Sequence, residues 1–146
     1  MKILHSVIIC VGLAFLCSCA TRNSNPSQLP ADVTMNKDAG RGNFLIVTLR
    51  LESGEELPFV LDTGTTVICL DKSLESKLGK RRGRGKMWHD GKIINPDFYT
   101  VPKLYFGNTP LVTSGKAVYI LDLKPISILS GHHIMGVLGM DCLRHY

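Results

Sequence analysis

One short acidic turn in this sequence has the composition of a catalytic loop. Asp62-Thr63-Gly64 follows the apolar run Pro58–Leu61 and precedes Thr65–Leu70, which is rich in β-branched residues. Both runs predict buried strands, so the Asp62 carboxyl group would be held between them at a bend that Gly64 permits. A carboxyl group in such a place can transfer protons in catalysis. Taken alone, the tripeptide is more typical of an ordinary tight turn.

A second unusual segment lies near the C-terminus. Ile134–Leu143 reads IMGVLGMDCL, an apolar strand with two glycines that runs directly into a predicted helix. Gly136 and Gly139 permit another part of the backbone to approach closely. The alternative is a core strand that glycines merely interrupt.

Together the two segments resemble the aspartic peptidases of the retropepsin and pepsin type. In that family an Asp-Thr-Gly or Asp-Ser-Gly loop follows a buried strand, and an apolar-apolar-Gly segment before the last helix crosses beneath the loop; Val137-Leu138-Gly139 matches this segment. Leu74–Gly79 and Val101–Gly107 are similar to stretches of bacterial aspartyl protease family proteins. The resemblance covers residues 43–146.

The resemblance implies a peptide-bond hydrolase with a small closed β-barrel of the retropepsin or pepsin-lobe type. Two facing carboxyl groups share one proton and activate a water molecule, without a metal or any other cofactor. Asp62 would be the catalytic carboxyl group, Thr63 would hydrogen-bond across to the partner loop, and Gly64 would let the loop approach a peptide or protein substrate.

This chain offers only half of such a site. Asp62 is the only Asp in a Thr-Gly turn, and Asp141 is predicted at a helix start. A homodimer would supply the second carboxyl group. The other source is a second lobe that is missing here. The end of the sequence at Tyr146 favours a missing lobe, because the last helix of the resembled family would there run into a final strand. The alternative function is a catalytically inactive, peptide-binding envelope lipoprotein of the same fold.

The surrounding pattern predicts a mainly β domain with one or two short helices, built as a small barrel or sandwich. Asp71 is expected to cap a short helix, and Asp90-Gly91 is a strong hairpin signal. The expected strands are Asn43–Leu51, Leu57–Leu61, Thr65–Leu70, the two halves of the Met87–Ile94 hairpin, Tyr99–Phe106, Lys116–Leu121 and Ile134–Leu138, and the expected helices are Lys72–Leu78 and Met140–Tyr146.

The Asp90-Gly91 hairpin lies where the resembled family has a flap that covers the substrate. The resemblance therefore implies substrate-binding roles for Trp88, Asp90 and Gly91. The alternative is an ordinary exposed hairpin.

The charge pattern argues against nucleic-acid binding. The chain has 146 residues and a net charge of +5, but five of its 17 basic residues lie in Lys80–Lys86, and the other 12 match the 12 acidic residues. A duplex-binding protein spreads basic residues over a face. We interpret Lys80–Lys86 as a solvated loop or, alternatively, as a contact for anionic lipid head groups. His132-His133 has no further ligand at a metal-binding spacing.

The N-terminus predicts export and a membrane anchor. Lys2 precedes an apolar stretch, Val7–Leu16, as in a signal peptide. Leu16-Cys17-Ser18-Cys19 resembles the bacterial lipobox, with Cys19 as the lipidated residue. Residues 1–19 are then a signal, residues 20–42 a tether, and the domain faces the periplasm or the cell exterior, lipid-anchored or secreted.

Two of the five cysteines, Cys69 and Cys142, fall within the predicted domain. An exported protein can join them in a disulfide, or both can be small buried apolar residues. The family resemblance places the strand after Asp62 near the last helix and so implies the disulfide.

Overall fold

The structure is a computed structural model that describes residue 36 and residues 43–146. The predicted signal, the lipobox with Cys19 and all of the predicted tether except Asn36 lie outside these residues. Within the described part, no helix is long and apolar enough to cross a membrane.

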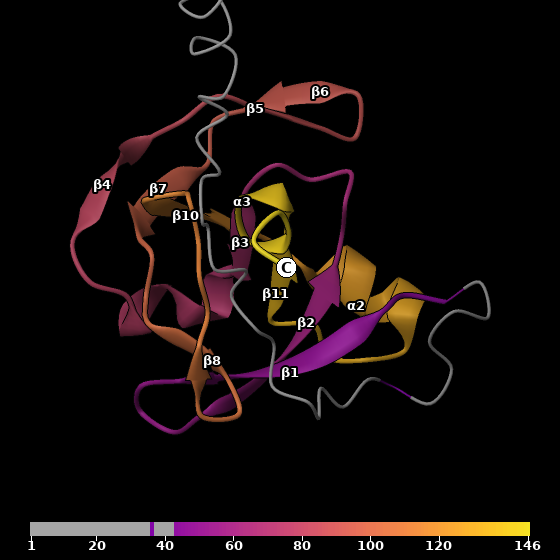
Figure 1. Cartoon of the computed structure of the whole chain (residues 1–146). Coiled ribbons are helices and arrows are strands. Elements are labelled where there is room, and N and C mark those ends of the chain that lie inside the picture. Colours follow the sequence, from indigo (N-terminus) through magenta and orange to yellow (C-terminus); the bar gives the residue numbers. More distant parts are fainter. Residues whose placement is uncertain (1–35, 37–42) are drawn as a thin grey trace, which may run out of the picture.

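The described chain is mainly β, as predicted, with few and short helices (Figure 1). The strands are β1 (Ile46–Leu51), β2 (Glu56–Leu61), β3 (Ile68–Asp71), β4 (Arg81–Arg84), β5 (Met87–His89), β6 (Lys92–Ile94), β7 (Asp97–Thr100), β8 (Leu104–Phe106), β9 (Thr109–Pro110), β10 (Ala117–Leu121) and β11 (Gly136–Leu138). The helices are the 3-10 helix η1 (Lys72–Lys77), α2 (Lys124–Ser130) and α3 (Met140–Leu143).

Nine strands form one curled, mixed sheet in the order β4-β7-β10-β3-β11-β2-β1-β8-β9. The pairs β10–β3 and β11–β2 are parallel, and the other pairs are antiparallel. In the described part, the end strands β4 and β9 do not pair with each other. The hairpin β5–β6 forms a separate two-stranded sheet.

Strand β11 lies between the two strands that flank the Asp62 loop. Val137 pairs with Val60 of β2 on one side and with Cys69 of β3 on the other. All three β11 residues are buried, and a Cβ atom at Gly136 would collide with the ring of Phe59. The glycine therefore allows a large side chain to fill the space beside the crossing strand.

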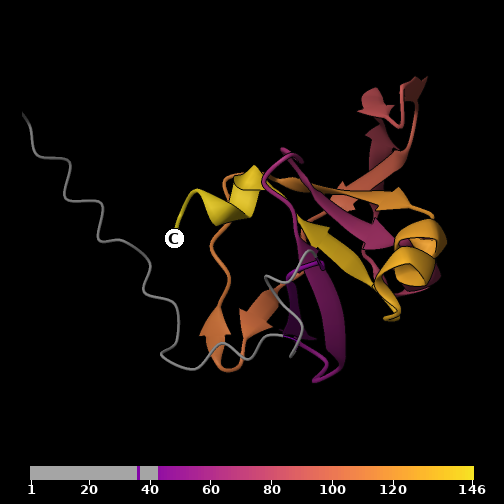
Figure 2. The same cartoon turned by 90° about the vertical axis from the view of Figure 1, so that its right-hand side faces the viewer.

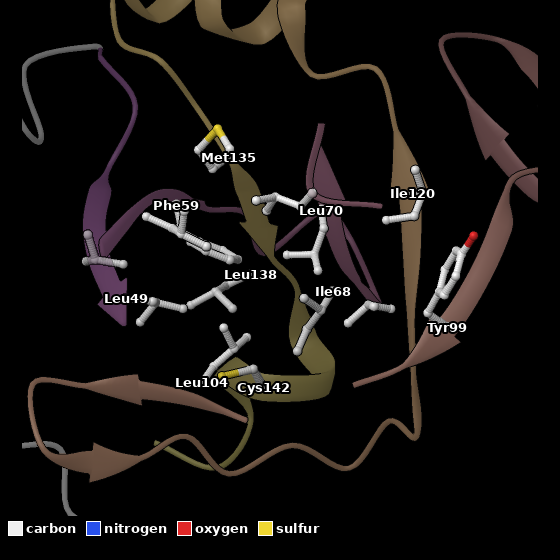
Figure 3. Close-up of a cluster of buried hydrophobic side chains, with 14 of the residues drawn as sticks. Leu49, Phe59, Ile68, Leu70, Tyr99, Leu104, Ile120, Met135, Leu138 and Cys142 are labelled. Atoms are coloured by element: carbon white, nitrogen blue, oxygen red, sulfur yellow. The ribbon is translucent and has the colours of Figure 1, made fainter. Parts of the chain in front are cut away.

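The core is divided between the two faces of the sheet because side chains alternate along each strand. One cluster fills the inside of the curl and includes Leu49, Phe59, Ile68, Leu70 and Leu138 (Figure 3). The other face carries a second cluster that α2 helps to cover, with Ile46, Val60, Cys69, Leu123, Ile134 and Val137.

This alternation shows that the predicted disulfide is wrong. Cys69 belongs to the second cluster, whereas Cys142 belongs to the first, and both are free buried thiols. The neighbours of Cys69, Ile68 and Leu70, face the first cluster instead. Two side chains on opposite faces of a sheet cannot be bridged without backbone movement.

The structure also corrects several predicted boundaries. Lys80–Lys86 is not a loop, because Arg81–Arg84 forms the edge strand β4 against β7. Tyr99–Phe106 is divided into β7 and β8, and the last helix ends at Leu143. Helix α2 was not predicted. The predicted Met87–Ile94 hairpin and the Asp71-capped helix are confirmed.

Candidate functional site

Asp62 sits where β2 ends, and its backbone continues the pairing with β11. The Asp62 N–H donates to the carbonyl oxygen of Leu138 at 3.0 Å. The chain then turns, and the Thr65 N–H donates back to the Asp62 carbonyl oxygen at 3.3 Å. The half-buried Asp62 side chain is thus carried by a short turn fixed at both ends.

The Asp62 carboxylate accepts two hydrogen bonds from its own loop. The Gly64 N–H donates to Oδ1 at 2.8 Å, and the Thr65 hydroxyl donates to Oδ2 at 2.5 Å. Each oxygen keeps a free lone pair. The loop therefore orients the carboxyl group without using up its capacity to bind a water molecule or a substrate.

The Asp62 loop rests on the start of α3. The Met140 N–H donates to the Thr65 carbonyl oxygen and the Asp141 N–H to that of Thr66, each at 2.8 Å. A Cβ atom at Gly139 would lie 2.5 Å from the Thr65 oxygen, so only glycine leaves room for this contact. The structure thus brings Val137-Leu138-Gly139 against the loop.

A pocket opens beside this loop, with a volume of about 650 Å³. Of the predicted site residues, Asp62, Gly64, Trp88 and Asp90 line it, whereas Thr63 and Gly91 do not. Its lining is a mixture of apolar and polar residues and also includes Phe44, Thr65, Thr66, Val67, Cys69, Lys86, Met87, His89, Tyr119, Leu121, Asp122, Leu123, Pro125, Ile126, Leu129 and Val137. A concave site that combines apolar walls with polar groups can hold a ligand.

The sequence patterns did not predict helix α2, which contributes Pro125, Ile126 and Leu129 to the pocket lining. Pro125 in the first turn and Gly131 at the left-handed C-cap (φ +67°) are ordinary helix boundary signals. The helix has only seven residues, too few to show an apolar periodicity that would identify it in the sequence.

The β5–β6 hairpin supplies another part of the pocket lining. Asp90 and Gly91 adopt φ angles of +47° and +73°, the left-handed pair that a two-residue turn between twisted strands requires. Met87 packs against the second core cluster, while Trp88 is 71% exposed. Four hairpin residues, Met87, Trp88, His89 and Asp90, line the Asp62 pocket.

Thr63 lies at the exposed tip of the loop and makes no hydrogen bond to the described part of the chain. Asp141 is turned away from pairing with Asp62: its carboxylate lies next to Gly115 and 3.8 Å from Arg144. Within the described residues, Asp62 has no carboxyl group hydrogen-bonded to it.

Cys69 lines the pocket beneath Asp62, but its thiol is protonated. Burial, and then the negative charge of Asp62, raise the pKa of Cys69 to about 12. A thiol with such a pKa is a poor nucleophile. Cys69 is therefore part of the pocket wall and does not perform thiolate chemistry.

No group of three or more His, Cys, Asp or Glu side chains suited to a metal ion lies together in residues 36 and 43–146. No protein-family model matches the chain. No curated protein matches it either.

Proposed function

We propose that this chain is a retropepsin-like aspartic endopeptidase that hydrolyses peptide bonds with paired Asp62 carboxyl groups from two chains or lobes. The proposal includes the closed barrel of that family, for which the curled sheet is partial support. It also includes a lipid anchor at Cys19 and a location on the outer side of a bacterial membrane.

The observation that carries the proposal is the relation between the Asp62 loop and β11. An apolar-apolar-Gly strand passes between the two strands that flank the acidic turn, and the turn is hydrogen-bonded to it and to the helix that follows. This construction holds a carboxylate at the side of a pocket that a hairpin also lines.

The exposed tip of the loop supports a site completed by a second copy. Thr63 and Gly64 are exposed, so another Asp62 loop can approach them about a twofold axis. Thr63 would then hydrogen-bond to the partner loop and keep the two carboxyl groups coplanar.

The proposed chemistry needs only these two groups and water. Two carboxyl groups in contact share one proton because both cannot be ionised at close range. The ionised one takes a proton from a water molecule, whose oxygen attacks the carbonyl carbon of the substrate, while the other gives its proton to the carbonyl oxygen. In the collapse of the resulting tetrahedral diol, one hydroxyl group returns its proton to the second carboxylate, and the C–N bond breaks. The nitrogen leaves as an amine with the proton that the first carboxyl group had taken from water.

A binding protein without turnover is the second candidate. It is favoured by the solitary position of Asp62 among the described carboxyl groups. The same pocket would then hold an extended peptide but would have no second carboxyl group to complete the catalytic pair.

The two candidates are separated by incubating the purified protein with unfolded casein between pH 3 and pH 7. The peptidase cleaves casein, and Asp62→Asn, which keeps the side-chain shape but cannot act as the base, lowers the rate at least about 1,000-fold. Equal cleavage by both proteins would reject the proposal. Casein binding without cleavage by either protein would favour the binding protein.

A further inference from the structure

A second feature of the molecule is a projecting segment, residues 80–94, which we term the arm. It consists of the edge strand β4 and the β5–β6 hairpin. Figure 2 shows the arm projecting from the body of the domain, with β4 as the end strand of the nine-stranded sheet and the β5–β6 hairpin as a separate sheet. Its only sheet partner in the described chain is β7, which pairs with β4.

The outer face of the hairpin carries two large apolar side chains. Trp88 and Ile93 are directly opposite each other in the β5–β6 pairing, so their side chains share one face of the hairpin. They are 71% and 64% exposed. The adjacent Met87–Ile94 pair, on the other face, is half-buried. Although Trp88 also borders the pocket, most of its surface remains uncovered.

The arm is also strongly basic. It contains one acidic residue, Asp90, and six basic residues: Lys80, Arg81, Arg82, Arg84, Lys86 and Lys92. Arg81 and Arg84 share a single carboxylate, that of Asp97, at 2.6 Å and 3.1 Å. In the described part of the chain, no carboxylate pairs with the other four cations.

We infer that the arm docks on an anionic lipid surface. Tryptophan and isoleucine enter the region between head groups and acyl chains, while lysine and arginine remain at the head groups. Each cation close to an anionic leaflet adds to the attraction. The charge excess thus complements a lipid surface in the same segment that carries the exposed apolar pair.

The shape of β4 argues against an acidic peptide strand as the occupant. The register between β4 and β7 shifts between Arg81 and Gly83, and such a bulge together with charged side chains protects an edge from strand addition. A membrane requires no backbone pairing. A second copy of the chain, which carries the same positive charge, would be repelled at this surface.

Trp88 allows a direct test, because it is the single tryptophan of the chain. The full-length chain, made without lipidation, is titrated with phosphatidylcholine vesicles that contain or lack phosphatidylglycerol, and Trp88 emission and co-sedimentation are recorded. We expect a blue shift and quenching by brominated lipid with anionic vesicles only. Trp88 emission reports on the arm itself, whereas co-sedimentation also responds to the apolar N-terminal stretch Val7–Leu16.

Variants separate the two contributions to docking. K80Q/R82Q/K86Q should lower partitioning into anionic vesicles roughly 100-fold, at about fivefold per charge, and Ile93→Ser about tenfold. The matched control K72Q/K77Q/K103Q removes the same charge elsewhere, and Ile128→Ser removes an equally exposed apolar side chain from α2. Neither control should change the anionic-vesicle response.

Three results would overturn the inference. The first is unchanged Trp88 emission on anionic vesicles. The second is equal loss of binding in the arm variants and in the control variants. The third is a blue shift that follows protein concentration without vesicles, which would mean that a second copy covers the arm. Asp62→Asn should dock like the unaltered chain, so this test is independent of the proposed hydrolysis.

Discussion

Gly139 and Thr65 are in backbone contact: a Cβ atom on Gly139 would lie 2.5 Å from the Thr65 carbonyl oxygen, which accepts the Met140 N–H at 2.8 Å. Gly139→Ala must therefore push the Asp62 loop away from α3. We expect a loss of about 1–3 kcal/mol in the free energy of unfolding, measured by urea denaturation. Any casein cleavage should fall as well, because the loop that orients Asp62 moves.

Gly79→Ala is the matched control for this substitution. A Cβ atom at Gly79 meets nothing within 4 Å, and its φ angle is not left-handed. The same change of residue there should alter stability by less than about 0.5 kcal/mol. Equal effects at Gly79 and Gly139 would contradict the proposed close contact.

The thiols of Cys69 and Cys142 should be free but slow to react in the folded protein. Burial raises the pKa of Cys142 to about 11, and burial together with Asp62 raises that of Cys69 to about 12. Iodoacetamide at pH 8 should label neither cysteine until urea is added, as peptide mapping would show. A Cys69–Cys142 peptide in the unreduced digest would contradict the structure.

Asp71 joins two separate parts of the fold through its carboxylate. One oxygen accepts the Ser73 N–H and caps η1, and the other accepts the Leu123 N–H before α2, both at 2.9 Å. Burial acts to raise the pKa of Asp71, but the hydrogen bonds from Ser73 and Leu123 outweigh it and hold the pKa below its usual value. The ionised form therefore stabilises the fold.

Asp71→Ala should thus cost about 1–2 kcal/mol at pH 7. Because the pKa is lowered in the folded state, the stabilisation is complete above the unfolded-state pKa of about 3.9 and is lost as the pH falls through the folded-state value. The difference between the two proteins should shrink below about pH 4 in urea denaturation. Asp71→Asn, which keeps a cap acceptor, should cost less; a difference that grew in acid would contradict the assignment.

Local signals in the sequence predicted the local structure well. Asp90-Gly91 between apolar residues correctly predicted the β5–β6 hairpin, and Asp71 correctly predicted the capped helix η1. Both features depend on residues within one turn of each other, so the nearby sequence contains the necessary information.

The missed elements depend on distant contacts. Arg81–Arg84 lacks the β-branched and aromatic residues that indicate a strand, yet it pairs with β7, where Asp97 binds both Arg81 and Arg84. The prediction of a Cys69–Cys142 disulfide was wrong for a related reason. The strand bearing Cys69 does lie close to α3, but the face on which each sulfur lies depends on the strand register.

The candidate site was predicted in part. The pairing of Asp62 with an apolar-apolar-Gly segment was visible in the sequence, and the structure places these segments together. The wall formed by Tyr119 and α2 was not visible, because the parallel pairing of β10 with β3 brings it to the pocket from about 50 residues away.

The central claim is that two Asp62 carboxyl groups form one site, and the stoichiometry of inhibitor binding tests it most directly. The protein is mixed with a statine-type analogue of the tetrahedral intermediate, and the complex is weighed by native mass spectrometry. The account predicts two chains with one inhibitor, and no complex with Asp62→Asn. One inhibitor on each separate chain, or equal binding by Asp62→Asn, would contradict it.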